Sequence, residues 1–156
     1  KRKVIAAIPT DRPVSVERET FPRMLEETGR LYALQSEGYW LDIGTPEKYE
    51  QAQHDVLLGC VGLPPAPGAV ERSLGVWVQG SPEIAADALL EPPCLIGDGA
   101  VIGARAQIAN SVVGKGVKVG ADSAVRDAIL LEGASVSDGA DVKSLAVTGE
   151  CELSVV

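Results

Sequence analysis

One carboxylate, Asp42, has an unusual place in this sequence. It follows Trp40 and Leu41, bulky residues that favour a β-strand, and it precedes a Gly44-Thr45-Pro46 turn. In α/β domains the ends of strands and the loops after them bind ligands, so Asp42 could hold a hard cation such as Mg²⁺. The alternative is that Asp42 accepts hydrogen bonds from the turn itself, which is a common role for aspartate.

The residues around Asp42 predict the elements that position it. Thr45 suits an N-cap, and Pro46 suits the first helical position, where no N–H is needed. Apolar residues then recur three or four apart, which predicts an amphipathic helix over 46–58; they are Tyr49, Ala52, Val56 and Leu57. Upstream, the sequence predicts strands over 31–36 and 39–43, and a short helix over 22–27 that ends at Gly29.

The run Trp40-Leu41-Asp42-Ile43-Gly44-Thr45-Pro46, followed by Tyr49, resembles the end of the catalytic domain of sugar-1-phosphate nucleotidylyltransferases. It is most similar to the mannose-1-phosphate guanylyltransferase branch, as is Ser15-Val16-Glu17-Arg18-Glu19 before Phe21-Pro22. The resemblance implies a reaction of a sugar 1-phosphate with an NTP, giving an NDP-sugar and pyrophosphate. The protein then mostly positions the reactants, while Mg²⁺ neutralises developing charge.

The same resemblance assigns roles to four side chains. Asp42 would bind Mg²⁺ together with a second aspartate from earlier in the domain, which this chain lacks. Glu17 could bind a sugar hydroxyl, and Arg12 or Arg18 a phosphate oxygen; the alternative is a solvated loop and helix cap. The family's glycine-rich nucleotide-binding loop is also absent, no catalytic residue is assigned, and we expect the chain to be inactive alone.

Residues 1–58 are therefore interpreted as the C-terminal portion of a Rossmann-like α/β nucleotidyltransferase domain. The stretch 59–73 is rich in Gly and Pro and has no periodicity, so it is predicted to be a linker. Residues 74–156 form the second predicted domain. The chain does not begin with Met, which suggests the later part of something longer.

A six-residue repeat dominates that second domain. Aliphatic residues recur every five or six positions, a period of neither a helix nor an alternating strand; they are Ile84, Leu90, Ile96, Ile102, Ile108, Val113, Val119, Val125, Leu131, Val136, Val142, Val147 and Leu153. Small residues four positions after these aliphatic residues fit tight corners, and glycines directly after several of the aliphatic residues suit turns. The pattern resembles the left-handed parallel β-helix of hexapeptide-repeat proteins, so the chain is expected to be mainly β, with roughly four triangular coils.

Hexapeptide-repeat proteins have two competing uses. One is acyl transfer, in which a histidine of the coils commonly acts as general base, but residues 84–156 contain no histidine. A carboxylate such as Asp98, Asp122, Asp127 or Asp138 could replace it, although these fall at turns where aspartate is expected. The other use is assembly, so the β-helix is expected to bind a second copy of the chain or a partner catalytic domain.

Composition narrows the partners and the compartment. The formal net charge of −8 argues against nucleic acid, because binding a phosphate backbone needs clustered Lys and Arg. Cys60, Cys94 and Cys151 are too scattered for a zinc site or disulfide framework, and are predicted to be buried thiols in a reducing compartment. No apolar stretch reaches membrane-spanning length, so a cytoplasmic protein is expected. The lone His54 is predicted on the exposed face of its helix.

Overall fold

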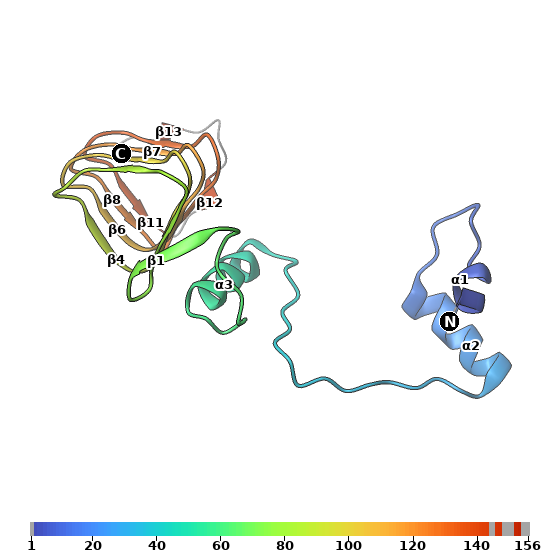
Figure 1. Cartoon of the computed structure of the whole chain (residues 1–156). Coiled ribbons are helices and arrows are strands. Elements are labelled where there is room, and N and C mark those ends of the chain that lie inside the picture. The colour runs from blue at the N-terminus through green and yellow to red at the C-terminus, as the bar shows by residue number, and fades with distance from the viewer. Residues whose placement is uncertain (1, 144–145, 148–151, 154–156) are drawn as a thin grey trace. The chain divides into compact units, whose positions relative to one another are not determined.

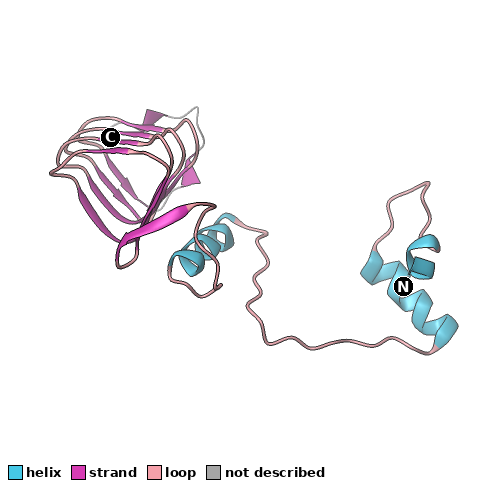
Figure 2. Cartoon of the chain, in the orientation of Figure 1, coloured by secondary structure: helices cyan, strands magenta, loops and turns pink. Residues whose placement is uncertain are grey.

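The computed structural model describes residues 2–143, 146–147 and 152–153, and the chain divides into two compact units. The described elements of the first unit, Lys1–Gly38, are helical: α1 (Arg2–Ala6), a π-helical turn η1 (Val16–Thr20) and α2 (Phe21–Thr28). The second unit, Tyr39–Val156, contains α3 (Pro46–Leu57) and all the strands (Figure 2). Among the described helices, none combines the length and the hydropathy needed to cross a bilayer.

The two predicted helices are confirmed. Gly29 follows α2 in the left-handed conformation, with a φ of 62°. Thr45 caps α3, because its side-chain oxygen accepts the backbone N–H of Lys48 over 3.3 Å. Both ends therefore follow from residue types that can be identified in the sequence.

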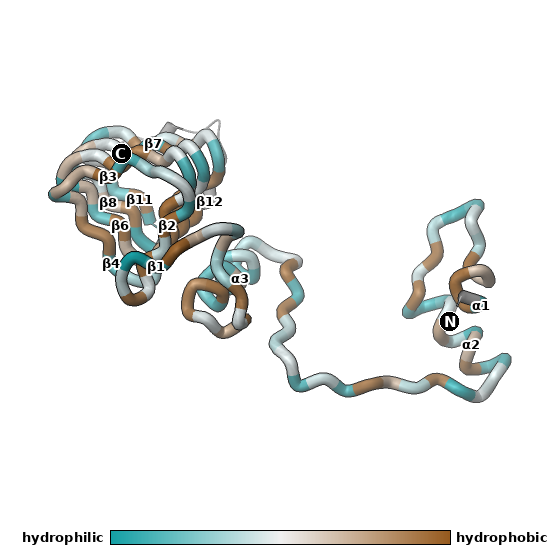
Figure 3. Tube along the Cα trace, in the orientation of Figure 1, coloured by the Kyte–Doolittle hydropathy of each residue, from teal (hydrophilic) through white to brown (hydrophobic). Residues whose placement is uncertain are grey.

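The two predicted strands over 31–36 and 39–43 are wrong, since neither segment is helix or strand. Apolar residues recur along this extended stretch (Figure 3), but Leu34 is 96% exposed and Trp40 81% exposed. A strand is stabilised only when a neighbour satisfies its backbone hydrogen bonds. No strand pairs with this stretch within the part of the chain that the structure describes.

The strands of the second unit wind into stacked triangular coils (Figure 1). One parallel sheet has the order β13-β10-β7-β5-β3, formed by β3 (Glu83–Ile84), β5 (Val101–Ile102), β7 (Lys118–Val119), β10 (Ser135–Val136) and β13 (Glu152–Leu153). The other sheet contains β1 (Ala69–Ser73), β2 (Val76–Gln79), β4 (Leu89–Ile96), β6 (Gln107–Val113), β8 (Ala124–Arg126), β9 (Ile129–Leu130), β11 (Asp141–Lys143) and β12 (Ala146–Val147). The predicted parallel β-helix is thus confirmed.

The stacked triangular coils have three faces, and the larger sheet forms two of them. On one face the first residues of β4 pair with those of β6, which pair with β8, which in turn pairs with β11. On the other face β2 pairs with the last residues of β4, these pair with the last residues of β6, and β9 and β12 follow in that order. We call the face made by β2, the ends of β4 and β6, β9 and β12 the covered face. Among the described strands, pairing in the coils is parallel, and β1 alone runs antiparallel, against β2.

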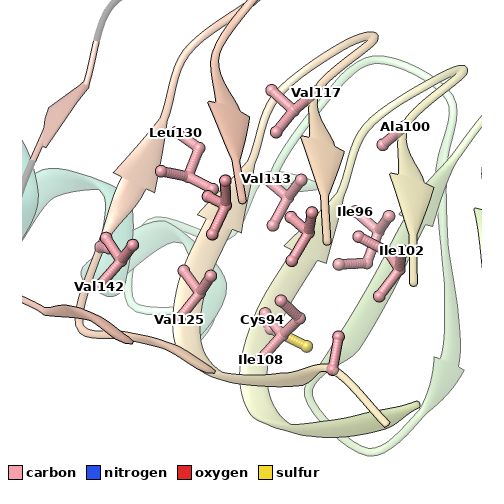
Figure 4. Packing of buried hydrophobic residues seen from close by; sticks show 14 of the residues in the cluster. Cys94, Ile96, Ala100, Ile102, Ile108, Val113, Val117, Val125, Leu130 and Val142 are labelled. Atoms are coloured by element: carbon pink, nitrogen blue, oxygen red, sulfur yellow. The ribbon is translucent and has the colours of Figure 1, made fainter. Parts of the chain in front are cut away.

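The predicted aliphatic repeat forms the core of the β-helix (Figure 4). Ile96, Ile108, Val113 and Val125 are fully buried and belong to one continuous cluster. One position needs correction, because Leu130 pairs with Val113 and is buried, whereas the predicted Leu131 is only partly buried. Coils after the first contain 17 residues rather than 18, which shifts the repeat by one position. The side chains of Val147 and Leu153 lie outside the described residues.

The glycines after the aliphatic positions have a different purpose from the one predicted. A Cβ built on Gly103 would lie 2.6 Å from the backbone nitrogen of Ala121 in the next coil. Gly97 has the same problem, with the carbonyl carbon of Gly114 at 2.7 Å. Neither glycine has a positive φ, so these positions need glycine because successive coils approach closely and not because the backbone turns.

The structure divides the chain differently from the sequence-based interpretation. The predicted linker, 59–73, ends in the strand β1, and α3 belongs to the β-helix unit instead of to the segment before it. The buried side chain of Leu57 explains this, because it joins a cluster formed with strands of the covered face.

The described cysteines are free thiols in two different environments. Cys94 is buried in the core as predicted, and burial raises the pKa of its thiol to about 11. Cys60 is exposed, so the prediction of burial is wrong for this residue, which lies just beyond the end of α3. Cys151 lies outside the described residues.

Candidate functional site

The segment 39–45, which carries Asp42, precedes α3 in an extended conformation. Asp42 is exposed, with Trp40 and Ile43 also exposed on either side of it. The segment then enters the helix through the Thr45 cap. The carboxylate of Asp42 is therefore accessible to a ligand.

The helix after Asp42 packs on the outside of the covered face. Four apolar side chains point outward there and pair in register from coil to coil; they are Trp77, Leu95, Val112 and Ile129. We call them the outer ladder. Leu57 of α3 is buried against the outer ladder, and Tyr49 is partly buried against it. Burial of apolar surface thus fixes α3 to the β-helix.

Two polar contacts add to this packing. His54 is half-buried rather than exposed as predicted, and its Nε2 donates a hydrogen bond to the carbonyl of Asn110 over 3.2 Å. Because a carbonyl only accepts, the proton must be on Nε2. The Tyr39 hydroxyl donates to Oδ2 of Asp55 over 2.7 Å, which ties the start of the Asp42 segment to the helix.

The three predicted substrate-binding residues all belong to the first unit. Arg12 binds both carboxylate oxygens of Glu19, with Nη2 at 2.7 Å from Oε2. This hydrogen bond and the charge of Glu19 raise the pKa of Arg12, and Arg12 lowers the pKa of Glu19. Glu17 and Arg18 are exposed, and the backbone N–H of Arg18 donates to the Ser15 hydroxyl. Asp42 belongs to the other unit.

The fit of a metal ion to Asp42 can be tested from the donors around it. Within the described ranges, no group of three His, Cys, Asp or Glu side chains could hold a metal ion. Mg²⁺ is usually bound by one or two carboxylates together with water and substrate phosphates. Asp42 can therefore supply one ligand of such a site but cannot form the site alone.

A hollow of about 460 Å³ lies where α3 ends, next to the β1–β2 hairpin. Its lining is apolar apart from Glu71, and it includes Leu57, Leu74, Trp77, Pro92 and Pro93. Glu71 already accepts the backbone N–H of Gly75 over 2.8 Å. No Lys or Arg lines this hollow, so it is unsuited to a nucleotide or sugar phosphate.

Sequence reasoning missed the outer ladder, although the signal was present. On the covered face the residue before each buried aliphatic is also apolar, as in Trp77-Val78 and Leu95-Ile96. On the face of β5 and β7 the corresponding positions include Lys118 and Ser135. An apolar outward position in every third hexapeptide indicates a face that another element covers.

A family model and the relatives of similar sequence point to the same group of proteins. Residues 74–153 match the family model described as the GMPPB C-terminal domain. The mannose-1-phosphate guanylyltransferase of Mycobacterium tuberculosis is 33% identical over 114 residues, which cover 72% of this chain and 31% of the relative. The mannose-1-phosphate guanyltransferase beta-A of Xenopus laevis is 36% identical over 87 residues, covering 55% and 21%. The chain thus spans about a third or less of these relatives.

Proposed function

Because this chain belongs to the GMPPB C-terminal domain family, we propose that it serves as the carboxy-terminal part of a mannose-1-phosphate guanylyltransferase. The reaction joins mannose 1-phosphate to the guanylyl group of GTP and releases pyrophosphate. The observation that supports this proposal best is that the Asp42 segment and the β-helix form one compact unit. The motif that resembles the catalytic domain and the repeat that matches the family are thus physically joined.

The residues of this chain would act mainly by positioning. Asp42 would contribute one carboxylate to Mg²⁺, with the second carboxylate and the nucleotide-binding loop supplied from outside the described residues. The ion would neutralise charge that develops on the phosphates during in-line attack by the sugar phosphate oxygen. Glu17 would bind a sugar hydroxyl.

The two arginines differ in how freely they could bind a phosphate. The exposed Arg18 could do so directly, whereas Arg12 would first have to exchange Glu19 for the substrate. A cytoplasmic location fits these substrates and the free thiols, and we keep it as part of the proposal.

The test is magnesium-dependent pyrophosphate release from GTP and mannose 1-phosphate. The chain is assayed alone, and then mixed with a separately produced amino-terminal half of a mannose-1-phosphate guanylyltransferase. We expect the chain alone to be silent and the mixture to be active. In the mixture, Asp42→Asn should lower the rate by about 100-fold, as for loss of one group that stabilises transition-state charge.

Asp11→Asn, which changes an exposed aspartate of the first unit, is the matched control and should leave the rate unchanged. An active mixture that tolerates Asp42→Asn would refute the metal role of Asp42. Activity of the chain alone would refute the need for an added half. Other NTP and sugar-phosphate pairs, assayed in parallel, test the choice of GTP and mannose.

A second function is favoured by a different observation. The described residues form no phosphate-binding loop, and Leu58 and Leu74 are exposed next to the covered face. These features suit a non-catalytic subunit that binds a second copy or a partner catalytic domain through its β-helix. Light scattering of the chain, alone and mixed with a full-length relative, should then reveal an assembly, whereas a monomer in both samples would exclude this function.

A further inference from the structure

Both ends of the segment 39–45 are attached to the same helix. At the start, the Tyr39 hydroxyl donates to Asp55 over 2.7 Å, and Asp55 lies in the last turn of α3. At the end, Thr45 caps the first turn of α3. The segment must therefore run back along the helix, from near its carboxyl end to its amino end.

This arrangement limits where Asp42 can move. Asp42 lies three residues from each attachment point, so each connection can span only about 10 Å of extended chain. A free segment of the same length, attached only at Thr45, could swing about that anchor with the remaining end loose. The hydrogen bond of Tyr39 thus closes residues 39–55 into a loop that is attached to α3 at both ends of the segment.

The helix that holds this loop is itself fixed to the β-helix. Leu57 is buried against the outer ladder, and His54 donates to the carbonyl of Asn110. Asn110 in turn donates from Nδ2 to Oδ1 of Asp127 in the next coil over 2.7 Å. A continuous series of contacts therefore connects the coils with the segment that carries Asp42.

We propose that Tyr39 and Asp55 are positioning residues, whose hydrogen bond holds the Asp42 segment along α3 and so at a fixed place on the β-helix. The catalytic purpose of this tether rests on the proposed function, because it matters only if Asp42 binds the metal. The β-helix then has a role within the reaction itself, as the platform that orients one metal ligand.

The ionisation of the tether fits this role. The hydrogen bond to Asp55 raises the pKa of Tyr39 to about 12, with desolvation and the charge of Asp55 acting in the same direction. The phenol therefore keeps its proton, and remains a donor, at neutral pH.

NMR relaxation of the backbone of the chain itself tests the tether without any enzymatic assay. Tyr39→Phe keeps the ring and removes only the donor, and Asp55→Ala removes the acceptor. Either change should lower the ¹⁵N order parameters of the backbone amides of residues 40–44 to below about 0.6, the range of flexible backbone, because the segment is then attached to α3 at one end only. The double variant should lower the order parameters no further than the single variants, because both single changes remove the same contact.

Tyr32→Phe is the matched control, since Tyr32 is 87% exposed, and it should change nothing. Amides of the coils should stay protected from hydrogen exchange in every variant, which shows that the β-helix remains folded. Unchanged order parameters in residues 40–44 of Tyr39→Phe would overturn the proposal, whatever the enzymatic result.

The catalytic purpose has a separate measurement in the complemented mixture. Tyr39→Phe should raise the Mg²⁺ concentration for half-maximal activity by about fivefold while changing KM for GTP little, because it loosens a metal ligand and no nucleotide contact. Equal Mg²⁺ requirements for Tyr39→Phe and wild type would overturn this purpose. An inactive wild-type mixture would refute the proposed function, and with it that purpose, while the order parameters of residues 40–44 would still decide whether the tether exists.

Discussion

The extended segment 31–43 and the coils of the β-helix contain the same kinds of residues, yet only the coils bury them. Leu34 is 96% exposed and Trp40 81% exposed, whereas Ile108 and Val113 are fully buried. Each described strand of the coils has a parallel partner 17 or 18 residues away along the chain. The segment finds none among the described strands. A strand-like sequence therefore becomes a strand only where backbone partners exist.

A second difference appears within the β-helix, between its faces. Val112, on the covered face, is 8% exposed because α3 lies over it, whereas Val101 on β5 is 36% exposed. Both are outward-facing valines at equivalent positions of a hexapeptide. The covering helix, and not the repeat, makes one of them part of a hydrophobic cluster.

The strongest way to test the first comparison is to remove a side chain from each region. Ile108→Ala should lower the free energy of unfolding by about 2–5 kcal/mol, because it leaves a cavity between the coils of Leu90 and Val125. Leu34→Ala, the matched change in the exposed segment, should stay within about 0.5 kcal/mol. Urea unfolding of both variants measures the difference, and equal losses would contradict a packed coil core.

The difference between the covered face and the open face predicts an intermediate loss of stability. Val112→Asn buries an unpaired amide beneath α3 and should cost about 1–3 kcal/mol. It should also release the helix, so amides of residues 50–57 should exchange faster. Val101→Asn introduces the same side chain on an open face and should be nearly neutral. If the two variants unfold at the same urea concentration, α3 does not cover the outer ladder in solution.

The smallest predicted effect concerns an exposed ion pair at a corner of the coils. Arg105 donates from Nε and Nη2 to the two carboxylate oxygens of Asp122, each over 2.6 Å, and this lowers the pKa of Asp122 below its ordinary value of 3.8. The folded state thus gains stability above that value, and loses it as the pH falls through the lowered pKa. Arg105→Gln should therefore be slightly less stable than wild type at pH 7.

Urea midpoints at pH 7 and pH 2.5 check this sign. The difference between wild type and Arg105→Gln should be small at pH 7, because the pair is exposed, and should shrink in acid. A difference that grows as the pH falls would mean that Arg105 stabilises the fold by some means other than the carboxylate.

Much of the fold was predictable because its signals are local or periodic. The Thr45 cap, the Pro46 start and the Gly29 end depend on neighbouring residues alone, and the structure confirms each of them. The aliphatic repeat predicts stacked coils because a constant period places equivalent residues above one another. The single error of register, Leu131 for Leu130, arose where the repeat shortens from six residues to five.

The candidate site was less predictable. The motif around Asp42 identified the segment, but Tyr39, Asp55 and His54 have no distinctive sequence pattern. Their roles depend on which residues meet when α3 lies on the coils. The roles of Arg12, Glu17, Arg18 and Asp42 in binding stay predictions.

The sequence by itself determined the repeat, the helix ends and the family, since each depends on residue types at fixed spacings. Only the tertiary structure decided that α3 belongs with the β-helix, that Gly103 is needed for close approach of the next coil, and that the segment 31–43 forms no strand. Those outcomes depend on distant residues that come together, because burial and backbone pairing are properties of neighbours in space.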